Sequence, residues 1–219
     1  SGILAGNIKG KLVIEMSTVQ PETEIALAEK VRAKGATFLE CPVGGTTGPA
    51  RQGKLLGAAG GTKEDFARAK PLLDQLCRRA DLVGPVGSGS AMKLALNLPL
   101  LVYYQALGEA CTLVERFGID KKWMMEFLSE SSGGPNVLKN RGPVIAGVFE
   151  GKDPGPATID IDGTVKDLRT MVAEAKVSGA TLPIVETAIK VYDEARKEGW
   201  GPRDVVFIPS YWSKHRKGK

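Results

Sequence analysis

The sequence contains little of what several common kinds of active site require. It has a single histidine, His215, which lies near the end of the chain. Because histidine is the usual general base near neutral pH and a frequent zinc ligand, its scarcity argues against His-based catalysis and against an ordinary zinc site. Neither a P-loop nor a G-x-G-x-x-G phosphate-binding pattern occurs anywhere in the chain. We therefore expect any catalytic acid or base among other residue types.

Cysteine and long apolar runs are also scarce. The three cysteines, Cys41, Cys77 and Cys111, show no C-x-x-C spacing and stand among small or apolar neighbours, which is typical of buried thiols. A reducing, cytoplasmic location is expected. The longest uncharged stretch, residues 94–108, is too short to span a bilayer and contains Asn97. With no basic and apolar leader at the start of the sequence, we expect no association with a membrane.

Charge and composition are those of an ordinary globular protein. The chain has 219 residues, 30 Lys and Arg against 25 Asp and Glu, and 42% apolar residues, which predicts one or two folded domains. The net charge is +5, and five positive charges lie near the end of the chain, at Arg203, Lys214, Arg216, Lys217 and Lys219. A basic chain end of this kind is typical of a solvated tail, so we expect no nucleic-acid partner.

Hydrophobic periodicity predicts two kinds of structure along the chain. The first part alternates short apolar runs with helical patterns, which favours a largely parallel sheet covered by helices. Strands are expected at residues 11–16, 36–43, 54–59 and 81–84, and helices at 21–34 and 63–76. After this part only the helical period remains, with helices expected at residues 90–117, 121–129, 137–146, 164–178, 182–198 and 202–207. The sequence therefore predicts an α/β domain over residues 1–85 and an all-helical domain over residues 86–219.

Lys93 is the strongest single candidate for chemistry. Ser88 or Ser90 could cap the long helix, and Lys93 then lies in its first turns, near the positive end of the helix dipole and among apolar neighbours. Both effects are expected to lower the pKa of Lys93, which favours a role as general acid or base. Asn97 lies four residues later, on the same face of the helix. In the alternative interpretation, Lys93 extends into solvent and Asn97 caps a neighbouring loop.

Three further segments carry weaker signals. The loop containing Gly44, Gly45 and Thr46 could let backbone N–H groups approach a small carboxylate, or it could be a turn that needs positive φ. Thr18 follows a predicted strand, where ligands bind in α/β sheets, although a helix cap is an equal alternative. Lys166 stands at the start of a predicted helix, a position most often solvated.

Taken in order, four segments resemble the β-hydroxyacid dehydrogenase family, which includes 3-hydroxyisobutyrate dehydrogenase and tartronate semialdehyde (2-hydroxy-3-oxopropionate) reductase. Residues 15–18, E-M-S-T, are similar to the family's D-M-S-T segment, and residues 40–46, E-C-P-V-G-G-T, to its D-x-P-V-S-G-G loop. Residues 87–97 match its G-x-G-x-x-x-K-x-x-x-N helix start, and residues 166–168 its K-D-L. The similarity covers essentially the whole chain.

The resemblance implies a Rossmann-type domain, a helical domain like that of 6-phosphogluconate dehydrogenase, and reversible hydride transfer between NAD or NADP and a small β-hydroxy acid. Lys93 would be the catalytic acid or base and Asn97 would position substrate. The segment Gly44, Gly45 and Thr46 would hold the substrate carboxylate, while Thr18 and Lys166 would contact the cofactor. No metal is implied. A homodimer or homotetramer would cover the long helix that carries Lys93.

Two departures from the family pattern limit what the resemblance implies. Gly44 stands where the family has Ser, and Thr46 where it has Gly, so the particular hydroxy acid stays open. The family's Gly-rich cofactor loop would precede Ser1, so we expect a longer intact protein and poor NAD(P) binding by these 219 residues alone. A non-catalytic dimerisation or scaffold module of the same family is the alternative, although the lysine is replaced in such relatives. Imine-reducing relatives usually have Asp or Tyr at that position, so the presence of Lys93 disfavours them too.

Overall fold

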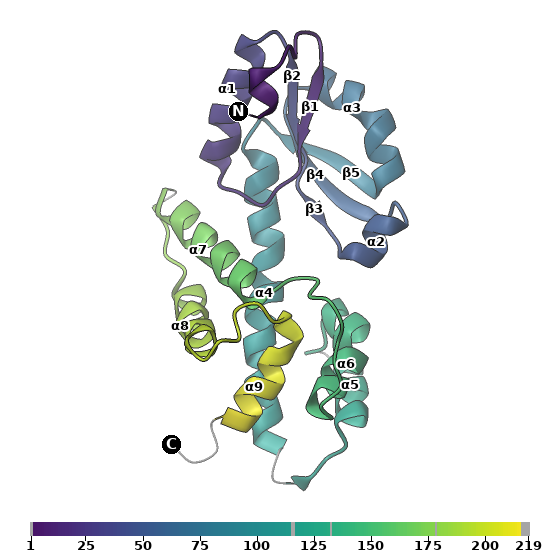
Figure 1. Cartoon of the computed structure of the whole chain (residues 1–219), viewed down its shortest axis with the longest axis vertical. Coiled ribbons are helices and arrows are strands. Elements are labelled where there is room, and N and C mark those ends of the chain that lie inside the picture. The colour runs from purple at the N-terminus through teal and green to yellow at the C-terminus, as the bar shows by residue number, and fades with distance from the viewer. Residues whose placement is uncertain (1, 115–116, 132, 178, 216–219) are drawn as a thin grey trace. The chain divides into compact units, whose positions relative to one another are not determined.

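The computed structural model describes residues 2–114, 117–131, 133–177 and 179–215 (Figure 1). It divides into two compact units. Unit 1 comprises Ser1–Asn97 and Thr170–Thr181, and unit 2 comprises Leu98–Arg169 and Leu182–Lys219. The long helices α4 (Ser88–Val114) and α7 (Ile161–Val177) each contribute residues to both units.

Unit 1 is built around a five-stranded mixed sheet. The strands are β1 (Leu12–Glu15), β2 (Thr37–Glu40), β3 (Val43–Gly44), β4 (Leu55–Gly60) and β5 (Cys77–Gly84). The pairs β1–β2 and β4–β5 are parallel, whereas β4 runs antiparallel to both β2 and β3. The longer strand pairings are therefore parallel, as expected, and the short antiparallel pairings of β4 make the sheet mixed. A parallel return needs a long crossover, and the connection between β3 and β4 contains only the five-residue helix α2 (Thr47–Arg51).

Strand β2 is covered on both faces because successive side chains of a strand point in opposite directions. Phe38 belongs to one buried cluster with Val31 of α1 (Pro21–Ala33). Its neighbour Leu39 belongs to another cluster with Leu73 of α3 (Lys63–Leu76). All four side chains are fully buried. The expected α/β class is confirmed, and both helices start and end within one residue of their predicted limits.

The strand limits differ more from expectation. β2 ends at Glu40 instead of reaching residue 43, and the chain begins β3 after Pro42. β5 begins at Cys77, well before the predicted start at residue 81. Arg78 and Arg79 are exposed on this strand, which among the described strands pairs with β4 alone and so forms an edge of the sheet. Charged residues are common on edge strands. Here they interrupt the apolar pattern from which the start of β5 was predicted.

Unit 2 is helical. Besides its parts of α4 and α7 it contains α5 (Lys121–Glu130), α6 (Asn136–Phe149), α8 (Pro183–Lys197), the 3-10 helix η3 (Val205–Phe207) and α9 (Ile208–His215). The helix predicted at residues 202–207 is wrong, because only a 3-10 turn forms there. Helix α9 was not predicted, although Pro209 in its first turn is a recognised start signal. The expected end of the long helix at residue 117 depends partly on residues 115 and 116, which lie outside the described residues.

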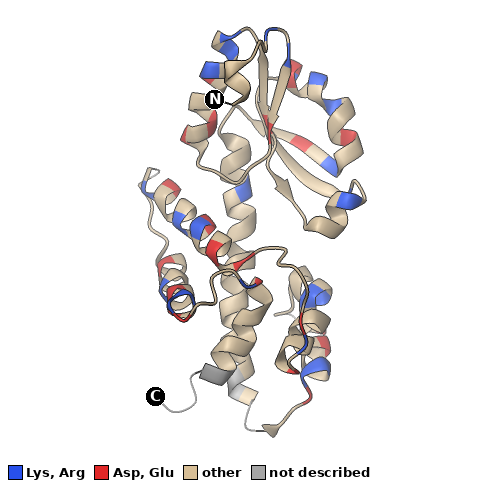
Figure 2. Ribbon diagram, in the orientation of Figure 1, with Lys and Arg blue, Asp and Glu red and all other residues tan. Residues whose placement is uncertain are grey.

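Helices α1, α3, α7 and α8 each carry both positive and negative side chains (Figure 2), as solvated helix faces do. All three cysteines are buried, as expected, and none of them forms a disulfide bond within the described residues. Within the described ranges, no helix is both long enough and apolar enough to cross a lipid bilayer.

Candidate active site

The candidate site lies where strands β1 and β2 end. Glu15 and Glu40 are the last residues of these strands and pair directly in the parallel register. Ser17 and Thr18 follow β1 at the same edge of the sheet. Ligands of open α/β sheets bind beyond the carboxyl ends of the strands. This edge of the sheet is therefore where a cofactor or substrate is expected to bind.

Glu40 fixes the start of helix α4 at this edge. Its fully buried carboxylate accepts four hydrogen bonds, from the backbone N–H groups of Gly87 (2.5 Å), Gly89 (3.0 Å) and Ser90 (3.1 Å) and from the Ser90 hydroxyl (2.6 Å). The first N–H groups of a helix have no partner within the helix, and a carboxylate is favourable at the positive end of its dipole. Glu40 therefore supplies both the acceptor and the opposite charge.

The expectation that a serine caps α4 is wrong. The Ser88 hydroxyl donates to the carbonyl oxygen of Pro85 at 2.6 Å, and the Ser90 hydroxyl donates to Glu40. The cap instead comes from a strand much earlier in the chain. The Glu40 carboxylate, and not a serine hydroxyl, therefore faces the positive end of α4.

Two glycines allow this close approach. A Cβ atom on Gly89 would lie 2.5 Å from the carbonyl oxygen of Ala58, and one on Gly60 would lie 2.1 Å from Glu40 Oε1. Real Cβ atoms do not approach so closely, so a larger residue at either position would separate the helix start from the sheet. Gly89 is the second glycine of the G-x-G segment that the sequence singled out.

Lys93 and Asn97 lie together on helix α4, as their spacing predicts. Lys93 Nζ donates to Asn97 Oδ1 at 2.9 Å, and each residue is 8% exposed. The alternative in which Lys93 extends into solvent does not describe this structure. A buried amine beside an amide oxygen is suited to proton exchange with a bound hydroxyl group.

A second buried glutamate lies near the end of β1. Glu24, in the first turn of α1, is fully buried. Burial and the neighbouring Glu15 raise the pKa of Glu24 to about 9, with a smaller contribution from the charge of Glu40. Glu24 is therefore protonated at neutral pH.

Glu15 itself is the charged partner of this pair. Partial burial acts to raise its pKa, but Glu24 and the hydrogen bonds from Ser17 outweigh burial and leave the pKa of Glu15 lowered. The Ser17 N–H and hydroxyl both donate to the Glu15 carboxylate. Helix α1 has Gln20 at its N-cap with no side-chain cap. The alternative in which Ser17 or Thr18 caps this helix is therefore wrong.

The predicted substrate loop is close-packed on one side and exposed on the other. Gly44 pairs with Leu56 in the sheet, and Gly45 has φ of 128°, which only glycine adopts readily. Thr46 is exposed at the start of α2 and makes no side-chain cap. The interpretation as a turn with positive φ describes Gly45, and binding of a carboxylate by the N–H groups of this segment stays a prediction.

Lys166 lies in unit 2. Its exposed side chain pairs with Asp167 Oδ1 at 2.9 Å, and Asp167 is 6% exposed. Thr18, Gly44, Gly45, Thr46, Lys93 and Asn97 all belong to unit 1.

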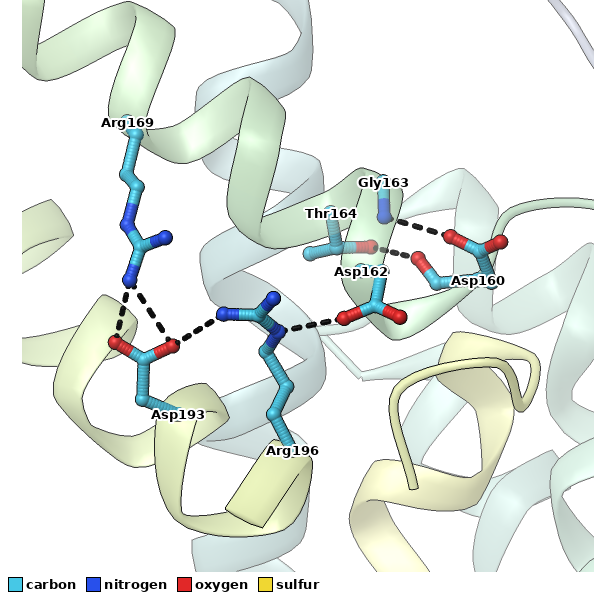
Figure 3. Close-up of polar contacts among 7 residues, drawn as sticks. All are labelled: Asp160, Asp162, Gly163, Thr164, Arg169, Asp193 and Arg196. Atoms are coloured by element: carbon cyan, nitrogen blue, oxygen red, sulfur yellow. Dashed lines mark hydrogen bonds and ion pairs between the residues drawn. The ribbon is translucent and has the colours of Figure 1, made fainter. Parts of the chain in front are cut away.

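Helix α7, which carries Lys166, is tied to α8 by a chain of ion pairs (Figure 3). Arg196 contacts Asp162 at 2.6 Å and Asp193 at 2.9 Å, and Arg169 contacts Asp193 at 2.8 Å. At the start of α7, Asp160 accepts a hydrogen bond from the Gly163 N–H at 2.6 Å. These contacts fix the helix turn on which Lys166 stands.

Sequence reasoning missed the roles of Glu40 and Glu24. A charged residue that ends an apolar strand, as Glu40 does, was a usable signal. Glu24 lies four and seven residues before the buried Ala28 and Val31, so helical spacing already placed its side chain on the buried face.

Two family models match the chain, one after the other. The first, described as the NAD binding domain of 6-phosphogluconate dehydrogenase, matches residues 1–84. The second, described as NAD-binding of NADP-dependent 3-hydroxyisobutyrate dehydrogenase, matches residues 87–211.

Individual proteins agree with these matches. Glyoxylate/succinic semialdehyde reductase 1 of Arabidopsis thaliana is 30% identical over 93% of this chain and 68% of its own length. A 3-hydroxyisobutyrate dehydrogenase of Pseudomonas aeruginosa is 35% identical over 84% of this chain and 62% of its own length. The crystal structure of 3-hydroxyisobutyrate dehydrogenase from Salmonella typhimurium superposes with a TM-score of 0.82 at 27% identity, over 91% of this chain and 68% of that one.

The fold, the strand edge and these matches define an NAD(P)-dependent oxidoreductase with a Rossmann-type sheet followed by helices. Within that class, the chain belongs to the β-hydroxyacid dehydrogenase family. Its cofactor is NAD or NADP.

Proposed function

We propose that the chain carries the substrate-binding and proton-transfer residues of a reversible oxidation of a small β-hydroxy acid, of the 3-hydroxyisobutyrate or tartronate semialdehyde class. The observation that carries this proposal is the buried Lys93 amine, held 2.9 Å from Asn97 on a helix whose start Glu40 fixes. Such an amine is both shielded from bulk water and positioned by a neighbour, which are the two conditions for an efficient acid or base.

NAD(P), when bound, would supply the acceptor for the hydride that leaves the carbon bearing the hydroxyl group. Neutral Lys93 Nζ takes the hydroxyl proton as the C–H bond breaks and the carbonyl group forms. In the reverse direction the protonated amine returns this proton to the oxygen. Asn97 orients the amine and the substrate hydroxyl by hydrogen bonding.

The remaining candidate residues take binding roles. The segment Gly44, Gly45 and Thr46, of which Gly45 and Thr46 are exposed, would hold the substrate carboxylate through N–H groups and the Thr46 hydroxyl. Thr18 fits a cofactor contact because it lies, half-buried, at the carboxyl edge of β1. Lys166 would be the second cofactor contact. Gly44 in place of the family's Ser removes one hydroxyl from the carboxylate site. The identity of the hydroxy acid is therefore determined by the turnover assay described below.

The scaffold alternative has one observation in its favour. The Aedes aegypti protein named cytokine-like nuclear factor N-PAC is 28% identical over 93% of this chain. Lys93 and its contact with Asn97 favour catalysis over this alternative. A homodimer or homotetramer accompanies the proposed function, and light scattering of the purified protein tests it.

The proposed function is tested on the polypeptide as the cell makes it. The protein is incubated with NAD+ or NADP+ and either 3-hydroxyisobutyrate or, as an α-hydroxy acid control, lactate. Tartronate semialdehyde is tested in the reducing direction. We expect turnover of at least one β-hydroxy or semialdehyde substrate and little of lactate. A folded protein that turns over none of them with either cofactor would instead be the scaffold.

A further inference from the structure

Unit 2 contains a pocket that the proposed reaction does not use. Its volume is about 570 Å³, and the residues around it include Lys152, Trp200, Arg203, Ser210 and Tyr211. They come from the loop after α6, the segment after α8 and the first turn of α9. The volume falls in the range of small-molecule sites.

The walls of this pocket place an arginine over aromatic rings. Trp200 packs edge to face with Phe207 and Tyr211, with ring centroids 5.8 and 5.1 Å apart. The guanidinium carbon of Arg203 lies 4.3 Å from the centre of the Trp200 ring and 5.3 Å from that of Phe207. Stacking of this kind orients the plane of the guanidinium group and leaves its N–H edge free to donate.

The Arg203 charge has no carboxylate partner within the described residues, although two acids line the same pocket. Asp204 is already engaged, because it accepts hydrogen bonds from Arg141 at 2.9 Å and from the Thr158 N–H at 2.8 Å. Asp153 accepts one from the Gly155 N–H at 2.9 Å. An oriented cation therefore faces the pocket without its counter-ion.

A second polar group points to a ligand. Ser210 is 4% exposed and lines the pocket, and its hydroxyl makes no hydrogen bond to any part of the chain that the structure describes. Most buried polar groups in proteins have a partner. The Ser210 hydroxyl, which has no hydrogen-bond partner within the described residues, and the Arg203 guanidinium group, which has no carboxylate partner there, thus line the same aromatic pocket.

We propose that this pocket binds an organic carboxylate with a flat apolar body. The carboxylate would accept two parallel hydrogen bonds from Arg203 and one from the Ser210 hydroxyl, and the body would pack against Trp200 and Tyr211. A guanidinium edge matches the geometry of a carboxylate. The acids Asp153 and Asp204 disfavour a doubly charged phosphate, because like charges in one pocket repel.

Benzoate is the probe, and isothermal titration calorimetry of the intact protein is the measurement. We expect saturable binding of benzoate, and binding of the neutral analogue benzamide at least about tenfold weaker. Arg203→Gln should weaken benzoate binding at least about tenfold, and Ser210→Ala by a smaller factor. The matched control Arg78→Gln removes an exposed arginine of β5 in unit 1 and should change nothing.

The proposal is overturned if benzoate shows no saturable binding, including the case in which another copy of the chain covers the pocket. It is also overturned if benzamide binds as well as benzoate, or if Arg203→Gln binds benzoate as well as the control does. Should Arg203→Gln fail to fold by circular dichroism, Arg203→Lys takes its place, since it keeps the charge and loses the paired donors. None of these outcomes depends on dehydrogenase activity.

Discussion

The start of helix α4 and the first turn of helix α1 each contain a fully buried glutamate, yet the two glutamates are in opposite situations. Glu40, at α4, accepts four hydrogen bonds. Glu24, at α1, receives none from the described residues and lies beside Glu15, which helps to raise its pKa to about 9. The difference shows that burial alone does not decide the charge of an acid. Backbone donors replace water around the Glu40 carboxylate, whereas Glu24, which has no such donors among the described residues, keeps its proton.

The largest effect is expected from Glu40→Ala, which removes the acceptor of four donors at the start of α4. Leaving these buried groups unsatisfied should lower the free energy of unfolding by about 3 kcal/mol, measured by urea denaturation. Glu40→Gln keeps one oxygen acceptor and should lose less. If Glu40→Ala unfolds at the wild-type urea concentration, the capping role assigned to Glu40 is wrong.

Gly89→Ala tests the same region by steric means. The added methyl group would lie 2.5 Å from the carbonyl oxygen of Ala58, so α4 must shift away from the sheet at a cost of about 2 kcal/mol in the free energy of unfolding. Gly48→Ala is the matched control, because nothing lies within 4 Å of its added Cβ. Equal melting temperatures for the two variants would contradict the close packing at Gly89.

Glu24→Gln should raise the free energy of unfolding, whereas Glu40→Ala and Gly89→Ala should lower it. The pKa of Glu24 is about 9 in the folded chain against an ordinary value of 4.5. Between these pH values the folded state holds a proton that the unfolded state has released, so stability contributed by Glu24 is lost as pH rises. Glutamine keeps the neutral shape at every pH. We expect a gain of about 1–2 kcal/mol near pH 8 that disappears near pH 4.

Melting curves of wild type and Glu24→Gln at several pH values make this comparison. A gain that does not change with pH would mean that Glu24 is not protonated in the folded state.

The smallest effect is expected from Ser90→Ala. It removes one of the four hydrogen bonds to Glu40 and leaves the three backbone donors in place. The expected loss in the free energy of unfolding is about 1 kcal/mol, measured by thermal denaturation. A loss as large as that of Glu40→Ala would show that the hydroxyl, and not the backbone, carries the contact.

The sequence predicted local features of this chain better than long-range ones. Helices α1 and α3 were found from apolar spacing and from turn residues such as Pro21 and Gly35. The contact between Lys93 and Asn97 also follows from helical spacing alone. The cap on α4 could not be predicted in this way, because its acceptor, Glu40, lies on a distant strand and the nearby serines offered a plausible local substitute.

The strands show the same limit. β5 was found only in part, since exposed arginines interrupt its apolar pattern. The sequence pattern indicated no direction for β4, because strand direction depends on how the connections between strands fold. Both properties are decided by tertiary contacts that no local pattern contains.

The most direct test of the proposed chemistry is the rate of a single turnover in Lys93→Met, measured by rapid mixing of the cofactor-loaded protein with its substrate. Lys190→Met is the matched control, because Lys190 is exposed on α8. We expect Lys93→Met to transfer hydride at least about 100-fold more slowly while its substrate affinity and melting temperature stay near those of the control. A rate within about twofold of the control would contradict the role of Lys93 as the acid and base.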